Sequence, residues 1–323
     1  MKNKHPHAAV VLVLGLAMAG LHLADLLLWS EADTGFAAAG SVWLRYIPWL
    51  AAFALPYLPA RRAAAQPAGL QDTNKPLGVC MALAGAALLA SGVASGNTAR
   101  YAILYPEVLS GSCPVWAAWA DLLLPIFAGA WLLNYAVRAF SGFGLQRQRL
   151  GSSLLAGAVP LVFLWRLIWR FQFAPASLCR MPCTLRVLSA AAALLLAVVL
   201  IKIFLVPGLP CGHTLYAAGT SAFLLCTGLE LPQTLFEAAR GMLTLPDLLT
   251  GIGIGLFGLC GLVCAWEGGE KAPPAIAVAR PPPLWGKLAE PARSEGLFPL
   301  PGRNCFYSSS STQSPSRYTF AAL

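Results

Sequence analysis

The sequence has few charged residues for its length. Only 11% of its 323 residues are Asp, Glu, Lys or Arg, whereas 58% are hydrophobic and the mean hydropathy is +0.66. Soluble globular proteins carry about 25% charged residues. This composition therefore excludes a soluble globule, and the length and apolar content exclude disordered, fibrous and small disulfide-rich proteins. The chain is expected to lie in a membrane.

The sequence also lacks the residue patterns of most catalytic and metal-binding sites. Its nine cysteines include no Cys-x-x-Cys pair, and its four histidines are not spaced as metal ligands. It has no phosphate-binding loop with a lysine. The run Gly253–Gly258 has the spacing of a dinucleotide fingerprint, but it lies inside an apolar segment with no preceding strand. We therefore expect no metal, no cofactor and no enzymatic activity.

Apolar segments long enough to cross a bilayer recur along the chain. A spanning helix needs about 20 mostly apolar residues, and eight segments meet this condition, at residues 8–29, 41–60, 77–95, 114–137, 151–171, 187–206, 213–231 and 247–266. We expect helices because the segments lack the alternating pattern of barrel strands. The predicted fold is an all-α, polytopic helical bundle over residues 1–266. Residues 267–323 are rich in Pro and Ser, which predicts a disordered tail.

The first segment has a second interpretation. Lys2 and Lys4 precede it, and residues Ala17–Ala19 have the small-x-small form of a secretory cleavage site. Apolar residues continue past this site to Trp29, which favours a retained helix. Cleavage would leave the orientation of the other seven helices unchanged.

The distribution of Lys and Arg predicts the orientation, because positive residues concentrate in cytoplasmic loops. With the N-terminus inside, the cytoplasmic loops contain Arg61, Arg62, Lys75 and Arg138. Both termini are then cytoplasmic, and the expected location is the cell membrane. The net charge of +9 follows from this topology and from contact with the anionic headgroups of the bilayer. No basic run with interleaved aromatic residues occurs, so we expect no nucleic-acid binding.

The turn between the fifth and sixth segments breaks this rule. On the predicted outer side it carries four arginines, Arg166, Arg170, Arg180 and Arg186. Further ionisable residues fall in the outer half when each is placed at its depth in its helix. They include His22, Asp25, Asp121 and Glu230.

The transfer of a carboxylate into the bilayer costs at least about a few kcal/mol unless the group is paired or hydrated. We therefore hypothesise a water-accessible, arginine-rich vestibule in the outer half of the bundle, with Asp25, Asp121 and Glu230 as counter-charges. It would receive a small anionic or zwitterionic solute. The candidate ligand-binding residues are His22, Asp25, Asp121, Arg166, Arg170 and Glu230. The alternative is a set of structural salt bridges and of side chains that reach the membrane interface.

Cysteines and glycines suggest two local features. Cys113, Cys179 and Cys183 are predicted on the outer side, where two of them could form one disulfide. In the last segment the glycines at positions 251, 255 and 258 lie on one helix face, which predicts close approach of a neighbouring helix.

The second half of the chain shows a resemblance to a known group of proteins. Its spaced residues are Pro160, Trp165, Arg170 and Pro175, then an apolar helix, and then Tyr216 and Pro232. In this spacing residues 150–265 resemble a family of uncharacterised eight-helix membrane proteins of Firmicutes. The resemblance implies a polytopic inner-membrane protein, and it assigns no activity and no functional residue.

Two classes of function fit these observations. The first is a protein that binds or transports a small solute through the outer polar residues. The alternative is a structural or sensory membrane protein that recruits partners without transport or catalysis. The sequence makes no prediction of the oligomeric state.

Overall fold

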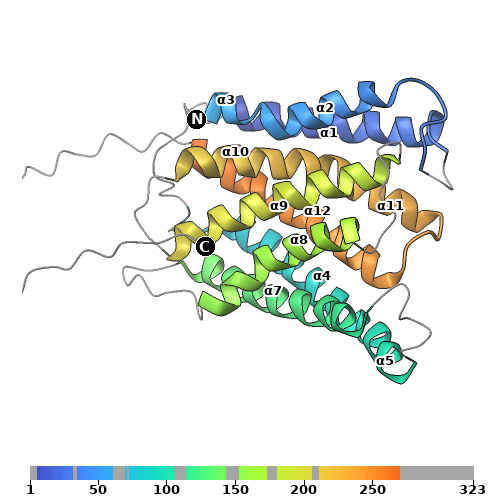
Figure 1. Cartoon of the computed structure of the whole chain (residues 1–323). Coiled ribbons are helices and arrows are strands. Elements are labelled where there is room, and N and C mark those ends of the chain that lie inside the picture. Colours follow the sequence, from blue (N-terminus) through green and yellow to red (C-terminus); the bar gives the residue numbers. More distant parts are fainter. Residues whose placement is uncertain are drawn as a thin grey trace, which may run out of the picture. The chain divides into compact units, whose positions relative to one another are not determined.

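The part of the chain that the structure describes is mostly helical. The computed structural model (Figure 1) describes residues 6–31, 35–60, 70, 73–105, 114–142, 153–172, 180–205 and 211–269. Within these ranges no strand forms, and only two isolated β-bridges occur. The predicted all-α class is therefore confirmed. The predicted disordered tail lies outside the described residues, apart from positions 267–269.

The helices follow the predicted segments closely. In chain order they are α1 (Pro6–Leu28), α2 (Val42–Ala54), α3 (Tyr57–Ala60), α4 (Lys75–Ala94), α5 (Gly96–Leu104), α7 (Val115–Ser141), α8 (Ser153–Gln172), α9 (Met181–Leu205), α10 (Gly212–Ala222), the π-helix η2 (Phe223–Glu230), α11 (Leu231–Ala239) and α12 (Leu245–Gly269). The elements α10, η2 and α11 follow one another directly. We call residues 212–239 the composite helix.

Two of the predicted segments are interrupted or altered. The second one breaks between α2 and α3 at Leu55 and Pro56, where the proline has no N–H to donate to the preceding turn. The seventh becomes the composite helix, whose π segment holds 8 residues and ends at Glu230. Single π turns inside α-helices often occur at functional sites.

Among the described residues, five helices are long and apolar enough to span a membrane. They are α1, α4 together with α5, α7, α9 and α12. Helix α8 contains a shorter apolar stretch, Leu154–Trp169, and α2 has 13 residues, which corresponds to about 20 Å. The apolar helices thus fit a membrane-embedded protein. Their lengths support five membrane passes, so the predicted number of eight passes stays a prediction.

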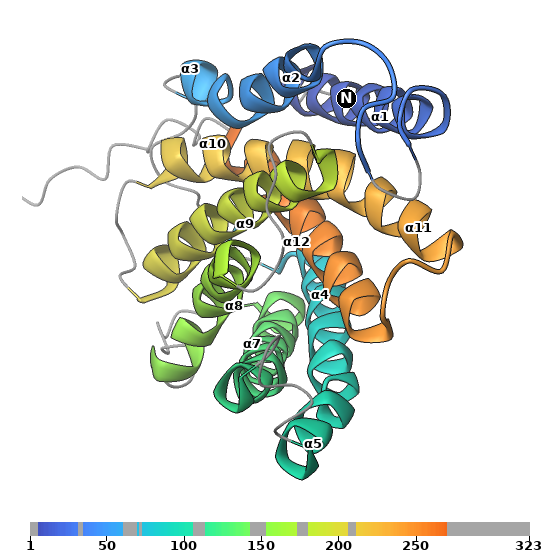
Figure 2. The ribbon, with the colours of Figure 1, turned by 45° about the vertical axis from the view of Figure 1, so that its right-hand side comes forward.

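Helix α12 lies at the centre of the bundle. It packs against α4, α10 and η2, and α4 in turn packs against α7. Both ribbon views show α1, α2 and α3 side by side along one edge, next to α10 (Figures 1 and 2). Helix α1 begins and α12 ends at the same end of the bundle (Figure 1).

The glycine face of α12 allows the composite helix to come close. A Cβ atom at Gly251, Gly255 or Gly258 would lie 2.5–2.8 Å from a side-chain atom of the composite helix. These distances are too short for a side chain, so the predicted close approach is confirmed. It brings Thr234 of the composite helix against α12, next to the polar residues described below.

Candidate functional site

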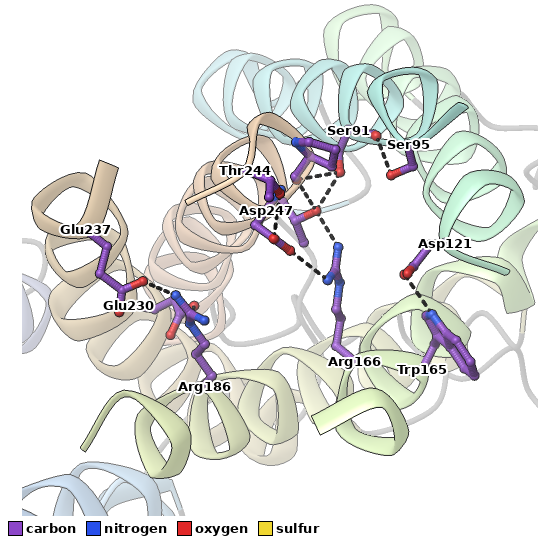
Figure 3. Close-up of polar contacts among 12 residues, drawn as sticks. Ser91, Ser95, Asp121, Trp165, Arg166, Arg186, Glu230, Glu237, Thr244 and Asp247 are labelled. Carbon is purple, nitrogen blue, oxygen red and sulfur yellow. Dashed lines mark hydrogen bonds and ion pairs between the residues drawn. The ribbon is translucent and has the colours of Figure 1, made fainter. Parts of the chain in front are cut away.

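Polar side chains from four elements meet at one end of the bundle (Figure 3). Between α8, α9, the composite helix and α12 lies a cavity of about 150 Å³, which we call the polar cavity. Its polar lining residues are Arg166, Arg186, Glu230, Thr234, Asp247 and Thr250. Two cations and two carboxylates therefore border one small space among apolar helices.

Arg186, in the second turn of α9, lies between two carboxylates of the composite helix (Figure 3). Its Nη2 donates a hydrogen bond to Glu237, and its Nε is 3.8 Å from Oε1 of Glu230. The other oxygen of Glu230 accepts a hydrogen bond of 3.2 Å from Ser189. The Glu230 side chain is only 5% exposed. Its charge is thus balanced inside the bundle by Arg186.

A chain of hydrogen bonds extends from Arg186 and Glu237 to α1. The amide nitrogen of Gln233 donates to Glu237 at 2.7 Å, so its amide oxygen faces Nε2 of His22, 3.0 Å away. That oxygen can only accept, which assigns the donor role to the His22 nitrogen. The chain therefore connects α1 to α9 through the composite helix.

Arg166 on α8 forms the second charged group of the cavity (Figure 3). Its Nη2 donates to the hydroxyl of Thr250 at 2.7 Å, and its Nη1 is 3.5 Å from Oδ1 of Asp247. The Thr250 hydroxyl in turn lies 2.5 Å from the hydroxyl of Ser91 on α4. Arg166 thereby connects α8 to α12 and, through Thr250, to α4.

The two arginines differ in how firmly they are paired. Arg166 has one carboxylate partner, Asp247, which is 48% exposed and 3.5 Å away. Arg186 has two, Glu230 and Glu237, which are only 5% and 10% exposed, and it donates a hydrogen bond to Glu237. Long, exposed ion pairs contribute about 0–1 kcal/mol and exchange readily. An incoming carboxylate can therefore displace Asp247 from Arg166 more easily than it can open the Arg186 pair.

Two of the predicted counter-charges, Asp25 and Asp121, have partners outside the polar cavity. Asp25 accepts from Nε of Arg45, with both carboxylate oxygens at 2.8 Å, and so ties α1 to α2. Asp121 accepts from the indole nitrogen of Trp165 at 2.9 Å (Figure 3). Neither aspartate lines the polar cavity. In each case a donor on an adjacent helix lies closer than the arginines of the cavity.

The remaining predicted site residues are distributed as follows. Arg166 and Glu230 line the polar cavity, and His22 is connected to its lining residue Arg186 through Gln233 and Glu237. For the fourth candidate, Arg170, the side chain lies outside the described residues. The same holds for Cys113 and Cys179, so the disulfide stays a prediction.

Several residues of the site were not singled out from the sequence. They are Ser91, Gln233, Thr234, Glu237, Asp247 and Thr250. One sequence signal was available: polar residues stand at positions 230, 233, 234 and 237, the spacing of a single helix face. No comparable signal marks Ser91 or Thr250.

The site contains no arrangement of metal ligands. Among the described residues, no group of three or more His, Cys, Asp or Glu side chains could hold a metal ion. Comparison of the chain with protein-family models, with curated proteins and with solved structures finds no match.

Proposed function

We propose that this chain is a multi-pass membrane protein that binds a small anionic or zwitterionic solute in the polar cavity and carries it across the bilayer. The observation that carries the proposal is the lining of this cavity, where Arg166, Arg186, Glu230 and Asp247 surround about 150 Å³ between apolar helices. Ionisable groups at such positions commonly mark the pathway of a solute or ion.

The charges of the cavity suit a solute that has both signs of charge. A carboxylate of the solute would replace Asp247 on Arg166, because the two groups are 3.5 Å apart and Asp247 is 48% exposed. A cationic group of the same solute would then face Asp247 and Glu230, which line the same cavity. A zwitterion thus leaves no charge of the cavity without a partner, which is the condition for binding charge away from water.

We also propose the finer topology of eight passes with both termini cytoplasmic, in the cell membrane. The eight helical stretches and the common end for the start of α1 and the end of α12 support it (Figure 1). Membership in the Firmicutes eight-helix family is likewise a proposal, and the spaced prolines and aromatic residues of positions 150–265 support it. We propose a binding or transport role rather than an enzymatic one.

Uptake into proteoliposomes tests the proposal. The probes are radiolabelled alanine and glycine betaine as zwitterions and lactate as an anion. We expect at least one of them to enter faster than into protein-free liposomes, and we expect Arg166→Gln to abolish this uptake. Arg100→Gln is the matched control, because it removes the same charge from an exposed position of α5.

One observation favours the alternative of a structural or sensory protein. Both arginines of the polar cavity already have carboxylate partners in the structure, as expected of residues that only hold helices together. In that case none of the three probes enters, and Arg166→Gln lowers the thermal stability of the protein without any change in flux.

A further inference from the structure

A second cavity lies beside the polar cavity, where α1 ends and α9 begins. It has a volume of about 120 Å³, and we call it the end cavity. Its polar lining residues are Ser30, Glu31, Arg180, Arg186, Gln233 and Glu237. Only Arg186 borders both cavities among the charged residues that line them.

Two polar atoms of the end cavity have unused hydrogen-bonding capacity. The Nε of Arg180 and the hydroxyl oxygen of Ser30 are both buried, and neither has a hydrogen-bond partner in the structure. Nearly all buried polar atoms in folded proteins are paired, so each exception needs an explanation such as an absent ion or ligand. Arg180 and Ser30 supply two such atoms that line the same cavity.

The backbone holds these two residues in place. Ser30 forms a β-bridge with Ala37, and Arg180 forms one with Phe36. Gly35, which has a φ of 72°, accepts a hydrogen bond of 3.1 Å from the N–H of Met181. Because glycine adopts positive φ without strain, this turn holds the backbone of both residues next to the start of α9.

The carboxylates of the cavity leave Arg180 available. Glu237 already accepts from Arg186 and from Gln233. Glu31 lines the cavity as well, and its own interactions lie elsewhere than at the unpaired Nε of Arg180. An anion beside Arg180 and Ser30 would therefore gain a charged donor and a hydroxyl without breaking the Arg186 pair.

We propose that the end cavity binds a phosphate group, with Nε of Arg180 and the hydroxyl of Ser30 as donors. The place of the cavity in the bundle supports phosphate, because it lies at the helix ends, and its lining residues Ser30 and Gly35 are next in sequence to Trp29 and Phe36, which are 50% and 41% exposed. Exposed aromatic residues at helix ends are typical of the headgroup level of a bilayer. Arginine and hydroxyl donors suit phosphate oxygens.

Apolar residues complete the site. Leu26, Phe236, Met242 and Leu243 line the end cavity together with its polar residues, so the start of an acyl chain or another apolar group could lie against them. The phosphate could therefore belong to a lipid headgroup or to a soluble phosphate ester. This second site is separate from the proposed solute site, and its test does not depend on transport.

A thermal-shift titration of the full chain in detergent tests the proposal. The probes are phosphatidylglycerol, inorganic phosphate and a phosphate-free glycolipid. Wild-type protein is expected to gain thermal stability with phosphatidylglycerol or with inorganic phosphate, and not with the glycolipid. The Arg180→Gln variant is expected to bind the effective probe at least about tenfold more weakly, since it loses a charged donor. Arg100→Gln, with the same change of charge, should bind as the wild type does.

The outcomes separate the two sources. A shift with phosphatidylglycerol alone assigns a lipid headgroup, and a shift with inorganic phosphate assigns a soluble phosphate ester. If Arg180→Gln does not fold, Ser30→Ala takes its place, because it removes one donor and keeps the charge. The proposal is overturned if no phosphate probe stabilises the wild type, or if the effective probe stabilises Arg180→Gln or Ser30→Ala to the same extent.

Discussion

The guanidinium of Arg186 on α9 donates a hydrogen bond to the carboxylate of Glu237 on α11, and this pair joins two helices at the border between two cavities. Both side chains are more than two-thirds buried, with exposures of 26% and 10%. A charge at such a position is costly once its partner is removed. The pair therefore stabilises the bundle mainly by keeping each charge compensated.

A double-mutant cycle measures this coupling. Arg186→Gln and Glu237→Gln are each expected to destabilise the protein, while the double variant should be more stable than the sum of the two by about 1–3 kcal/mol. The measurement is the free energy of unfolding by sodium dodecyl sulfate in mixed micelles. Additivity within about 0.5 kcal/mol would show that the two residues act independently.

Close helix packing gives the second prediction. A Cβ atom at Gly129 on α7 would lie 2.6 Å from the backbone oxygen of Gly85 on α4, so Gly129→Ala forces the two helices apart. We expect a loss of about 1–3 kcal/mol. Gly20→Ala is the control, because nothing lies within 4 Å of the added atom. Since alanine favours the helix over glycine by about 1 kcal/mol, the control should be neutral or stabilising in the same unfolding measurement.

The helices themselves were predictable from the sequence, and their interruptions were less so. Hydropathy predicted the long apolar helices, because the cost of unpaired backbone groups in lipid leaves few other structures. It did not predict α5 (Gly96–Leu104) or α11 (Leu231–Ala239), which extend beyond the apolar segments. The second segment breaks at Pro56, whereas Pro48, Pro125 and Pro160 lie inside α2, α7 and α8 without ending them, so a proline alone did not predict the break. The π-helix of positions 223–230 carries no mark in the sequence, because nothing in its apolar sequence distinguishes i→i+5 from i→i+4 hydrogen bonding.

Side-chain partners were predictable only when the two residues lie on consecutive helices. Asp25 and Arg45 lie at the facing ends of two consecutive helices, so their pairing could have been inferred from depth and order. Arg166 and Asp247 are separated by 81 positions, and their contact depends on which helices become neighbours. Hydropathy places a residue at a depth, but it does not say which helices are adjacent, so it did not indicate that Asp121 would contact Trp165.

Topology gives a third prediction. Ala38 lies in an exposed position between α1 and α2, and Ser141 is exposed at the end of α7. With both termini cytoplasmic, a membrane-impermeant maleimide should label Ala38→Cys in intact cells and Ser141→Cys only after permeabilisation. Peptide mass spectrometry reads each position separately from the nine native cysteines. Labelling of Ser141→Cys in intact cells, with none at Ala38→Cys, would show that the chain has the opposite orientation in the membrane.

Asp121 gives the fourth prediction, because its partner is a neutral donor. Its carboxylate accepts a hydrogen bond of 2.9 Å from the indole of Trp165, and this bond needs an acceptor oxygen rather than a charge. Asp121→Asn keeps such an oxygen, so its free energy of unfolding should stay within about 0.5 kcal/mol of the wild type, whereas Asp121→Leu should lose about 1 kcal/mol. If the asparagine variant is as unstable as the leucine variant, or if it alone abolishes uptake of a probe solute, the negative charge of Asp121 acts on something other than Trp165.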